Sequence, residues 1–339
     1  MVDKVLVTGV SGFLGGHIAV ELLRQGYAVR GSVRDTAKSD RIRASLAAAG
    51  ADVTHLELCA LDLLKDNGWS DALAGCRYLL HVASPFVLTM PKDESVLLRP
   101  AIEGARRAVQ AALDGGVERI VLTSSLAAID GGRQRYDRPL GPADWTDVNG
   151  PHVTAYAKSK TLAEREAWAM AERASRAGAL AVINPGTIIG PLLDRDPGTS
   201  AVIIQRMLRG DMPMLPDLIL PWVDVRDVAA AHAAAMTSPQ AAGKRTIVTN
   251  AALPLAAIAD ILRSRLGPQA ARVPTRRMPG WMASLMTLFD RSLRDGKTYL
   301  GIRREYDASS GSALLGRPLR ATDDAVEATA RSLLEMGLV

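Results

Sequence analysis

The sequence predicts an α/β protein whose main domain is a doubly wound parallel sheet, with a smaller, interleaved C-terminal lobe. Three observations support this prediction: short apolar runs alternate with helical stretches in the first half, a glycine-rich segment follows the first run, and the alternation stops after Asn184. Continuous apolar strands that alternate with helices are typical of a parallel sheet covered on both faces. Because crossovers between parallel strands are right-handed, this order favours a Rossmann sheet.

The first half can be assigned element by element. Residues 4–8 (KVLVT) are apolar and β-branched, as expected of a short buried strand, and the helix after the glycine-rich segment ends at Gly26. Further strands are expected at AVRGSV, VTHLEL, RYLLHVA, ERIVLTS and ALAVIN, with helices near residues 41–49, 69–74, 95–114 and 155–176. Parallel strands need such crossover connections.

Proline changes the pattern in the second half. Six prolines lie between residues 185 and 221, a density that excludes long helices and central strands there. A short helix at RMLRG interrupts this stretch, and a helix over residues 225–236 follows it. The apolar, Met-rich segment PGWMASLMTLFDRSL predicts a helix that covers either a substrate pocket or the core of the lobe.

Composition excludes several classes of protein. Of 339 residues, 48% are hydrophobic and 23% are charged, which is typical of globular proteins and excludes a disordered chain. The net charge is only +5, and aromatic residues make up 4%, too few for nucleic-acid stacking platforms. Cys59 and Cys76 lack the spacing of a metal site or a disulfide framework. With no secretory signal and no long apolar run, we expect a cytoplasmic protein without metal, nucleic-acid or membrane partners.

A glycine-rich loop follows the first expected strand. Residues 8–15 read TGVSGFLG, so Gly9, Gly12 and Gly15 have the spacing G-x-x-G-x-x-G. Small residues let the backbone approach a pyrophosphate, and the N–H groups at the start of a helix bind an anion. Such glycines also occur in ordinary tight turns, but their place after an N-terminal buried strand predicts a dinucleotide-binding site.

The end of the second expected strand indicates which dinucleotide is bound. Arg34 and Lys38 are placed to hold a 2′-phosphate, and Asp35 lies one place beyond the acidic position of NAD enzymes. We therefore expect NADP rather than NAD. In the alternative, both cations are solvated and Asp35 binds the ribose. Asp62, after the third strand, either accepts a hydrogen bond from the adenine amine or caps the following turn.

Candidate reacting groups lie in the helix over residues 155–176 and in the strand before it. Tyr156 and Lys160 are one helical turn apart, and an ammonium at that distance is expected to lower the tyrosine pKa. The preceding strand ends at Ser124 and Ser125, and Ser125 is placed to hydrogen-bond a substrate carbonyl, with Ser124 as its rival. The histidine at position 81 is expected to be a core residue, and those at 17 and 232 suggest nothing catalytic.

These motifs resemble the extended short-chain dehydrogenase/reductase family, and in particular its branch of dihydroflavonol reductases, cinnamoyl-CoA reductases, methylglyoxal/carbonyl reductases and bacterial aldehyde reductases. The similar segments are TGVSGFLGGH, GYAVRGSVRD, HVASPF, VLTSSLAAI, YAKSKTLAEREAW, NPGTIIGP and WVDVRDVAAAH, between residue 4 and about residue 236. The resemblance implies a Ser125–Tyr156–Lys160 triad. It also implies cofactor contacts from Gly9, Ser11, Gly12, Phe13, Leu14, Arg34, Lys38, Asp62, Leu63, Ala83, Tyr156, Lys160, Pro185 and Ser200.

Together these features predict an NADPH-dependent reductase of aldehydes or ketones in which Tyr156 donates the proton. Alternatives are a hydroxysteroid or sugar-nucleotide dehydrogenase or epimerase of the same superfamily, and a non-catalytic NADP-sensing regulator. Where flavonoid reductases usually carry asparagine this chain has Asp130, which favours a general carbonyl compound. The segment MPMLPDLIL predicts an apolar or aromatic substrate. The candidate substrate-binding residues are Phe86, Asp130, Met214 and Trp222.

The expected organisation follows from these assignments. Residues 1–185 form the dinucleotide-binding Rossmann domain, to which residues 221–250 return. Residues 186–220 and 251–339 form the substrate-binding lobe. The protein is expected to be a monomer or a homodimer.

Overall fold

The larger of two sheets confirms the expected doubly wound fold. The computed structural model describes residues 2–84, 93–133, 136–286, 288 and 299–339. The sheet has the order β3-β2-β1-β4-β5-β6-β9, and every neighbouring pair is parallel. Its strands are β1 (Lys4–Thr8), β2 (Ala28–Val33), β3 (Leu56–Ala60), β4 (Tyr78–His81), β5 (Arg119–Thr123), β6 (Leu180–Pro185) and β9 (Arg245–Val248). The order reverses between β1 and β4, which is where open α/β sheets bind ligands.

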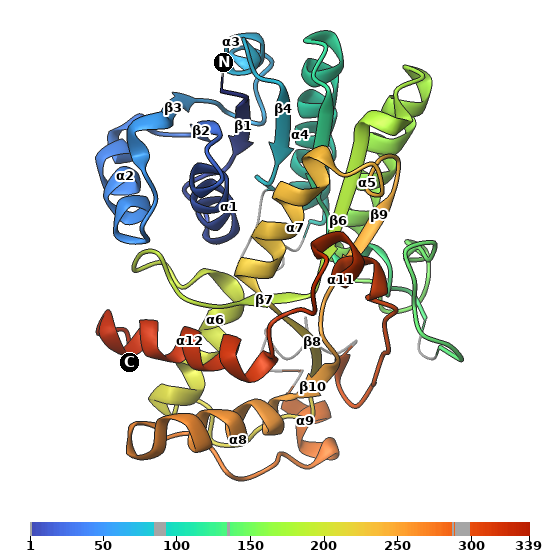
Figure 1. The fold of residues 1–339 in the computed structure, drawn as a ribbon. Helices are drawn as coiled ribbons and strands as arrows, with labels where there is room; N and C mark the ends of the chain where they lie inside the picture. Colours follow the sequence, from blue (N-terminus) through green and yellow to red (C-terminus); the bar gives the residue numbers. More distant parts are fainter. Residues whose placement is uncertain (1, 85–92, 134–135, 287, 289–298) are drawn as a thin grey trace.

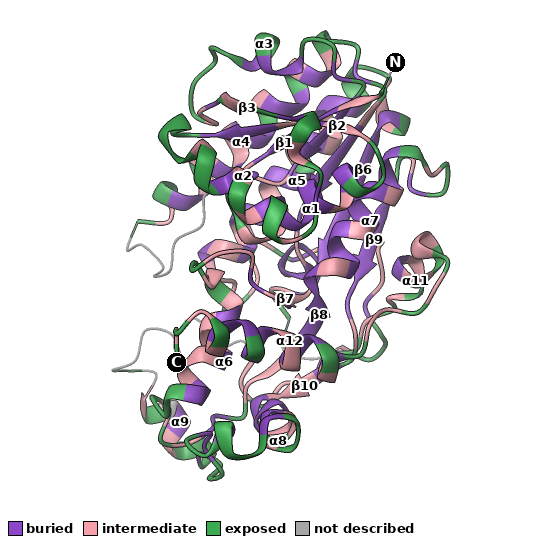
Figure 2. Ribbon diagram, turned by 60° about the vertical axis from the view of Figure 1, so that its left-hand side comes forward, coloured by how far each residue is buried: buried purple, intermediate pink, exposed green. Residues whose placement is uncertain are grey.

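Helices cover both faces of this sheet because successive strand residues point to opposite sides. Leu79 and Ile120 pack with α3 (Trp69–Leu73), α4 (Ser95–Asp114) and α5 (Ala155–Arg173) on one face. Their neighbours Leu80 and Val121 pack with α1 (Phe13–Arg24), α2 (Ser39–Ala48) and α7 (Val225–Thr237) on the other face. Figure 2 shows the buried strands between helices whose outer faces are exposed.

A second, smaller sheet lies beyond the C-terminal ends of the large-sheet strands (Figure 1). Its order is β10 (Ala252–Pro254), β8 (Ile219–Asp224) and β7 (Thr187–Ile189), with β8 parallel to β7 and antiparallel to β10. Helices α6 (Gly198–Arg209), α8 (Leu255–Leu266) and α12 (Thr322–Glu335) share an apolar core with it. Helix α6 is longer than the expected RMLRG segment because it begins directly after Pro197, and proline is tolerated at a helix start.

Two segments lie elsewhere than the expected domain bounds suggest. Strand β8 belongs to the smaller sheet, so the chain returns to the large sheet only at α7 and β9. Helix α11 (Ser309–Leu315) also returns, since Leu314 and Leu315 pack on the core formed with α1 and α7. Helix α9 (Gly280–Met286) begins the Met-rich segment. The division into two domains stays a prediction.

Among the described residues, the structure contains no helix long and apolar enough to cross a membrane.

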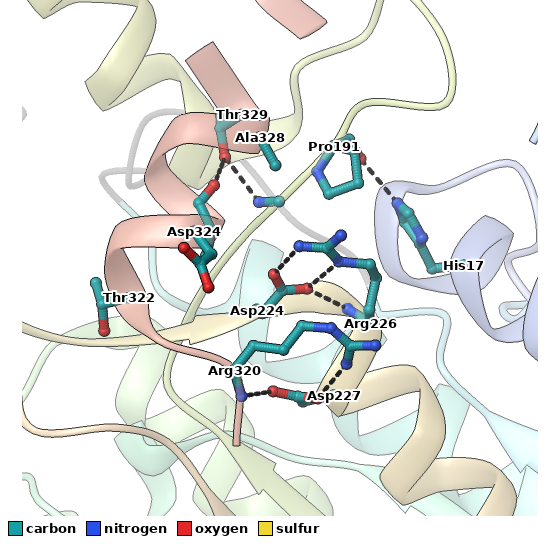
Figure 3. Close-up of polar contacts among 12 residues, drawn as sticks. His17, Pro191, Asp224, Arg226, Asp227, Arg320, Thr322, Asp324, Ala328 and Thr329 are labelled. Atoms are coloured by element: carbon teal, nitrogen blue, oxygen red, sulfur yellow. Dashed lines mark hydrogen bonds and ion pairs between the residues drawn. The ribbon is translucent and has the colours of Figure 1, made fainter. Parts of the chain in front are cut away.

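The junction between the lobes is held by buried aspartates at the start of α7 (Figure 3). Asp227 has no exposed side chain and accepts hydrogen bonds from the guanidinium of Arg317 at 2.7 Å and from the backbone N–H of Arg320 at 2.6 Å. The guanidinium of Arg320 forms a second ion pair with the same carboxylate. Asp224, also fully buried, pairs with Arg226 at 2.5 Å. The contacts of Asp227 tie the segment before α12 to the large-sheet domain.

Candidate active site

The glycine-rich loop has a backbone that other residues would not allow. Gly9 has φ +71°, and a Cβ added there would lie 2.9 Å from the Cβ of Ala83. A Cβ added at Gly15 would lie 2.2 Å from the carbonyl oxygen of Gly9, so the first turn of α1 packs directly on the loop. Helix α1 begins after Gly12, which provides no side-chain cap. Its first N–H groups therefore remain available to an anion, and these residues fit a dinucleotide pyrophosphate.

Arg34 directly follows β2, beside that loop in the sheet order, and Lys38 ends the short helix η1 (Thr36–Lys38) that comes next. Both side chains are exposed, and neither side chain has a hydrogen-bond or ion-pair partner within the described part of the chain. Asp35 is engaged locally, because its carboxylate accepts a hydrogen bond from the N–H of Ala37 at 2.9 Å. This arrangement leaves the two cations, rather than Asp35, available for a ligand.

The other predicted cofactor residues surround the same edge of the sheet. Asp62 caps a turn, since its Oδ1 accepts from the N–H of Leu64 at 3.0 Å, while its Oδ2 lies 4.0 Å from Lys65. The N–H of Ala83 donates to Oγ1 of Thr8 at 3.1 Å. A Cβ added at Gly198 would lie 3.5 Å from the Cβ of Phe13, so the start of α6, which carries Ser200, lies beside the glycine-rich loop. Leu63 follows Asp62, and Pro185 ends β6.

Tyr156 and Lys160 lie in the first two turns of α5. The helix starts at a capping threonine, where Oγ1 of Thr154 accepts from the N–H of Ala157 at 3.1 Å. The Lys160 Nζ lies 6.0 Å from the centroid of the Tyr156 ring. Burial lowers the pKa of Lys160 to about 8, and the nearby carboxylate of Glu164 opposes that shift.

The pKa of Tyr156 is raised rather than lowered as expected. Burial disfavours the phenolate, and a side-chain hydrogen bond with Ser125 only partly offsets that effect. The hydroxyl is therefore protonated at neutral pH in the protein alone. This is the state that a proton donor needs.

The two serines at the end of β5 have different surroundings. Ser125 contacts the tyrosine hydroxyl, and its Oγ also accepts from the N–H of Ala127 at 3.1 Å. Ser124 is buried, and its Oγ donates to a carboxylate oxygen of Glu164 at 2.5 Å. The geometry thus brings Ser125, and not Ser124, to Tyr156.

A buried ion pair below these groups was missed by the sequence analysis. Glu164 has no exposed side-chain surface and lies 2.5 Å from Nε of Arg245 on β9. It also accepts from Ser124 and, at 3.0 Å, from Nδ2 of Asn184, whose amide donates in turn to the carbonyl of Ser125 at 3.2 Å. The one-turn spacing of Glu164 after the lysine was a signal in the sequence. Nothing in the sequence placed Arg245 beside it.

The histidines at positions 17, 81 and 232 are buried residues with hydrogen-bond partners. His81 Nδ1 lies 3.0 Å from Oγ1 of Thr8, and burial lowers its pKa to about 3. His17 contacts the carbonyl of Pro191, and His232 contacts Thr123, with burial lowering each pKa to about 4. All three are neutral near pH 7, in keeping with structural rather than acid–base roles.

The candidate substrate residues lie in different places. Asp130 lines a cavity of about 600 Å³ that also reaches Thr154 and Ala157, which flank Tyr156 along α5. Met214 is half-buried and does not line that cavity, and Phe86 lies outside the described residues. The assignment of Trp222 as a substrate contact is wrong for this structure. Its ring is fully buried in the core of the smaller lobe, and its Nε1 donates to the carbonyl of Leu253 at 3.2 Å.

Known proteins share both the sequence pattern and the fold. A cinnamoyl-CoA reductase of Oryza sativa subsp. japonica is 37% identical over 71% of this chain and 69% of its own. The NADPH-dependent methylglyoxal reductase Gre2 of Saccharomyces cerevisiae is 28% identical over 98% of each chain. A crystal structure of the yeast methylglyoxal/isovaleraldehyde reductase Gre2 complexed with NADPH superposes with a TM-score of 0.81 at 25% identity, covering 99% of this chain and 100% of that chain.

The fold and these relatives define an NAD(P)-dependent reductase of the extended short-chain dehydrogenase/reductase type. The chain belongs to the NAD dependent epimerase/dehydratase family, which matches residues 5–250. That match covers the large sheet, the glycine-rich loop and the helix that carries Tyr156 and Lys160.

Proposed function

We propose that this protein reduces an aldehyde or ketone to the alcohol with NADPH, and that Tyr156 donates the proton. The observation that carries the proposal is the convergence of Ser125, Tyr156 and Lys160 at the C-terminal edge of the sheet, next to the glycine-rich loop. The yeast relative is NADPH-dependent, which agrees with the exposed side chains of Arg34 and Lys38.

Each of the three side chains has a separate task in this reaction. The glycine-rich loop, Arg34 and Lys38 would hold NADPH, which would supply the hydride when bound. The Ser125 hydroxyl donates a hydrogen bond to the carbonyl oxygen and stabilises the charge that develops there. Tyr156 donates its proton to that oxygen, and the Lys160 ammonium stabilises the phenolate that remains. Lys160 is buried, so its charge acts on the phenolate with little screening by water.

A panel of aldehydes and ketones, assayed by NADPH oxidation, tests the proposal. Turnover of at least one simple aldehyde or ketone, with the alcohol recovered as product, is the expected result. A protein that binds NADPH but reduces none of them would instead support the non-catalytic sensor. Turnover restricted to nucleotide sugars would support the sugar-nucleotide alternative.

We expect Arg34→Ala to weaken NADPH binding by about ten- to a hundredfold, because one charge-assisted contact to the 2′-phosphate is lost. NADH has no such phosphate, so its affinity should hardly change. Titration of each dinucleotide by fluorescence or calorimetry measures both affinities. Arg173→Ala, at the far end of α5 and 66% exposed, is the matched control and should change neither affinity. A preference of the unmodified protein for NADH would mean that Asp35 binds the ribose.

The rate of carbonyl reduction should fall as the pH rises through about 8. Below that pH the side chain of Lys160, whose pKa is about 8, carries its proton and stabilises the Tyr156 phenolate. Above it the neutral amine leaves the phenolate unsupported, and Tyr156 becomes a poorer acid. A profile of kcat/KM from pH 6 to 10 with saturating NADPH checks this expectation. A flat profile up to pH 9.5 would contradict it.

A further inference from the structure

The cavity beside the catalytic helix is large enough to hold a small-molecule substrate. Its volume of about 600 Å³ lies within the usual range for ligand pockets, about 300–1,000 Å³. Thr154 and Ala157 line it, so it reaches the first turn of α5 on both sides of Tyr156 in sequence. Tyr156 is not among the described lining residues, but Tyr299 is. Burial raises the pKa of Tyr299 and the Tyr156 side chain contributes to that shift, so the two phenols lie near each other. A substrate whose carbonyl is held at Tyr156 would extend past Tyr299 into this cavity.

The described lining of this cavity is mixed, with apolar residues such as Val153 and Ile302 beside three arginines, whereas the sequence analysis expected an apolar substrate. Among the described residues, Arg133, Arg303 and Arg304 line it together with one carboxylate, that of Asp130. Leu215, within the segment MPMLPDLIL that predicted an apolar or aromatic substrate, lies in the core of the smaller lobe. The hydropathy of this segment does not distinguish apolar residues that face a substrate from apolar residues that face the core of the lobe.

One of the three arginines is balanced within the protein. Arg304 is 4% exposed, and its guanidinium stacks on the ring of Tyr299 at 4.6 Å from the centroid. Its charge faces buried Asp130, which accepts hydrogen bonds from the hydroxyls of Tyr306 at 2.6 Å and Tyr299 at 3.3 Å. Burial raises the pKa of Asp130, and Arg304 opposes that shift. Asp130 is thus the counter-charge that faces Arg304 within the protein.

The other two arginines are not balanced in this way. Arg133 and Arg303 are exposed at the cavity, and neither has a hydrogen bond or an ion pair with any residue that the structure describes. The N-terminal end of the 19-residue helix α5, which reaches the cavity at Thr154, adds a positive potential. The cavity thus offers two unpaired guanidinium groups to whatever enters it.

We propose that the carbonyl substrate carries an anionic group, a carboxylate or a phosphate, that Arg133 and Arg303 bind while the carbonyl lies at Tyr156. Guanidinium groups bind both kinds of anion through paired hydrogen bonds. The inference rests on the proposed reductase activity for its catalytic part, but binding of the anion can be measured without turnover. Arg133 and Arg303 are substrate-positioning residues in this proposal and do not contact the reacting atoms.

Matched aldehydes that differ only in charge test the proposal with the NADPH-loaded protein. The compounds are 4-formylbenzoate, its neutral methyl ester and 4-formylphenyl phosphate. We expect kcat/KM for at least one anionic aldehyde to exceed that for the ester by about tenfold at low ionic strength, with the advantage shrinking as salt is added. The larger of the two advantages identifies carboxylate or phosphate as the group that fits.

Neutral variants locate the effect at the two arginines. Arg133→Gln and Arg303→Gln should each remove most of the roughly tenfold advantage by lowering kcat/KM for the anionic aldehyde relative to the ester. Arg331→Gln, an exposed arginine on α12, is the matched control and should keep the advantage. An ester reduced as well as both anions, or an advantage that survives both variants, would overturn the inference while leaving the reductase activity intact.

A binding measurement decides the inference even if none of the aldehydes is reduced. Calorimetric titration of the NADP⁺-loaded protein with 4-(hydroxymethyl)benzoate, 4-(hydroxymethyl)phenyl phosphate and the methyl ester of the former compares charge without chemistry. If an anionic alcohol binds more tightly than the ester and Arg303→Gln removes that difference, the anion site is supported. The absence of turnover would then contradict the proposed reductase function and not the anion site. Equal affinity for all three compounds would show that the arginines are only solvated surface groups.

Discussion

Tyr156→Phe should lower kcat for carbonyl reduction by about 10²-fold or more, because the variant has no proton to donate to the substrate oxygen. The ring and its packing stay in place, so the fold and the affinity for NADPH should be preserved. Stopped-flow or steady-state NADPH oxidation gives the rate, and titration of NADPH gives the affinity. Near-normal turnover would remove Tyr156 from the mechanism.

Three further variants test whether this effect is specific to the proposed catalytic groups. Tyr27→Phe removes a hydroxyl from a tyrosine that packs edge-on against Tyr78, far along the sheet from the site, and should leave turnover unchanged. Lys160→Ala should impair turnover as strongly and also weaken NADPH binding, since the resemblance gives that side chain a cofactor contact. The double variant of Tyr156 and Lys160 should be little worse than either single one, because groups that act as a unit are not additive.

Most of the large sheet could be predicted because its signals are local. Buried parallel strands such as KVLVT read as short apolar runs, and the glycines of the loop after β1 are required by backbone contacts within a few residues. Tyr156 and Lys160 share a helix, so their spacing alone places them on one face. The choice of Ser125 over Ser124 came from the family resemblance, and the structure provides the physical reason in the bond from Ser124 to Glu164.

The rest depends on contacts between distant parts of the chain. Arg245 lies 81 residues from Glu164 in sequence, and nothing near either residue indicates that they meet under the catalytic helix. Trp222 was expected at the substrate because apolar segments in a pocket wall and in a lobe core have the same hydropathy. The return of α11 to the large-sheet domain was likewise invisible, since a short amphipathic helix fits either lobe.

Asp227→Asn should lower the free energy of unfolding by about 3 kcal/mol, the low end for breaking a buried ion pair. The carboxylate has no exposed surface and pairs with two arginines that are 39% and 38% exposed. Asparagine nearly preserves the shape, so the loss is one of charge and not of packing. It would leave Arg317 and Arg320 without their counter-charge, although water at their exposed sides limits the cost. Urea unfolding followed by circular dichroism measures the change.

The segment that a protease cleaves first distinguishes this prediction from a general loss of stability. Because Asp227 binds the backbone N–H of Arg320, the variant should expose the segment before α12 to protease earlier than the large-sheet domain. Asp66→Asn is the control. It makes the same substitution in the ion pair between Asp66 and Arg107, in which the Asp66 side chain is 81% exposed. Its unfolding should stay close to that of the unmodified protein, since exposed pairs contribute little. If the two substitutions lowered the free energy of unfolding equally, burial would not make the Asp227 ion pairs more stabilising than an exposed pair.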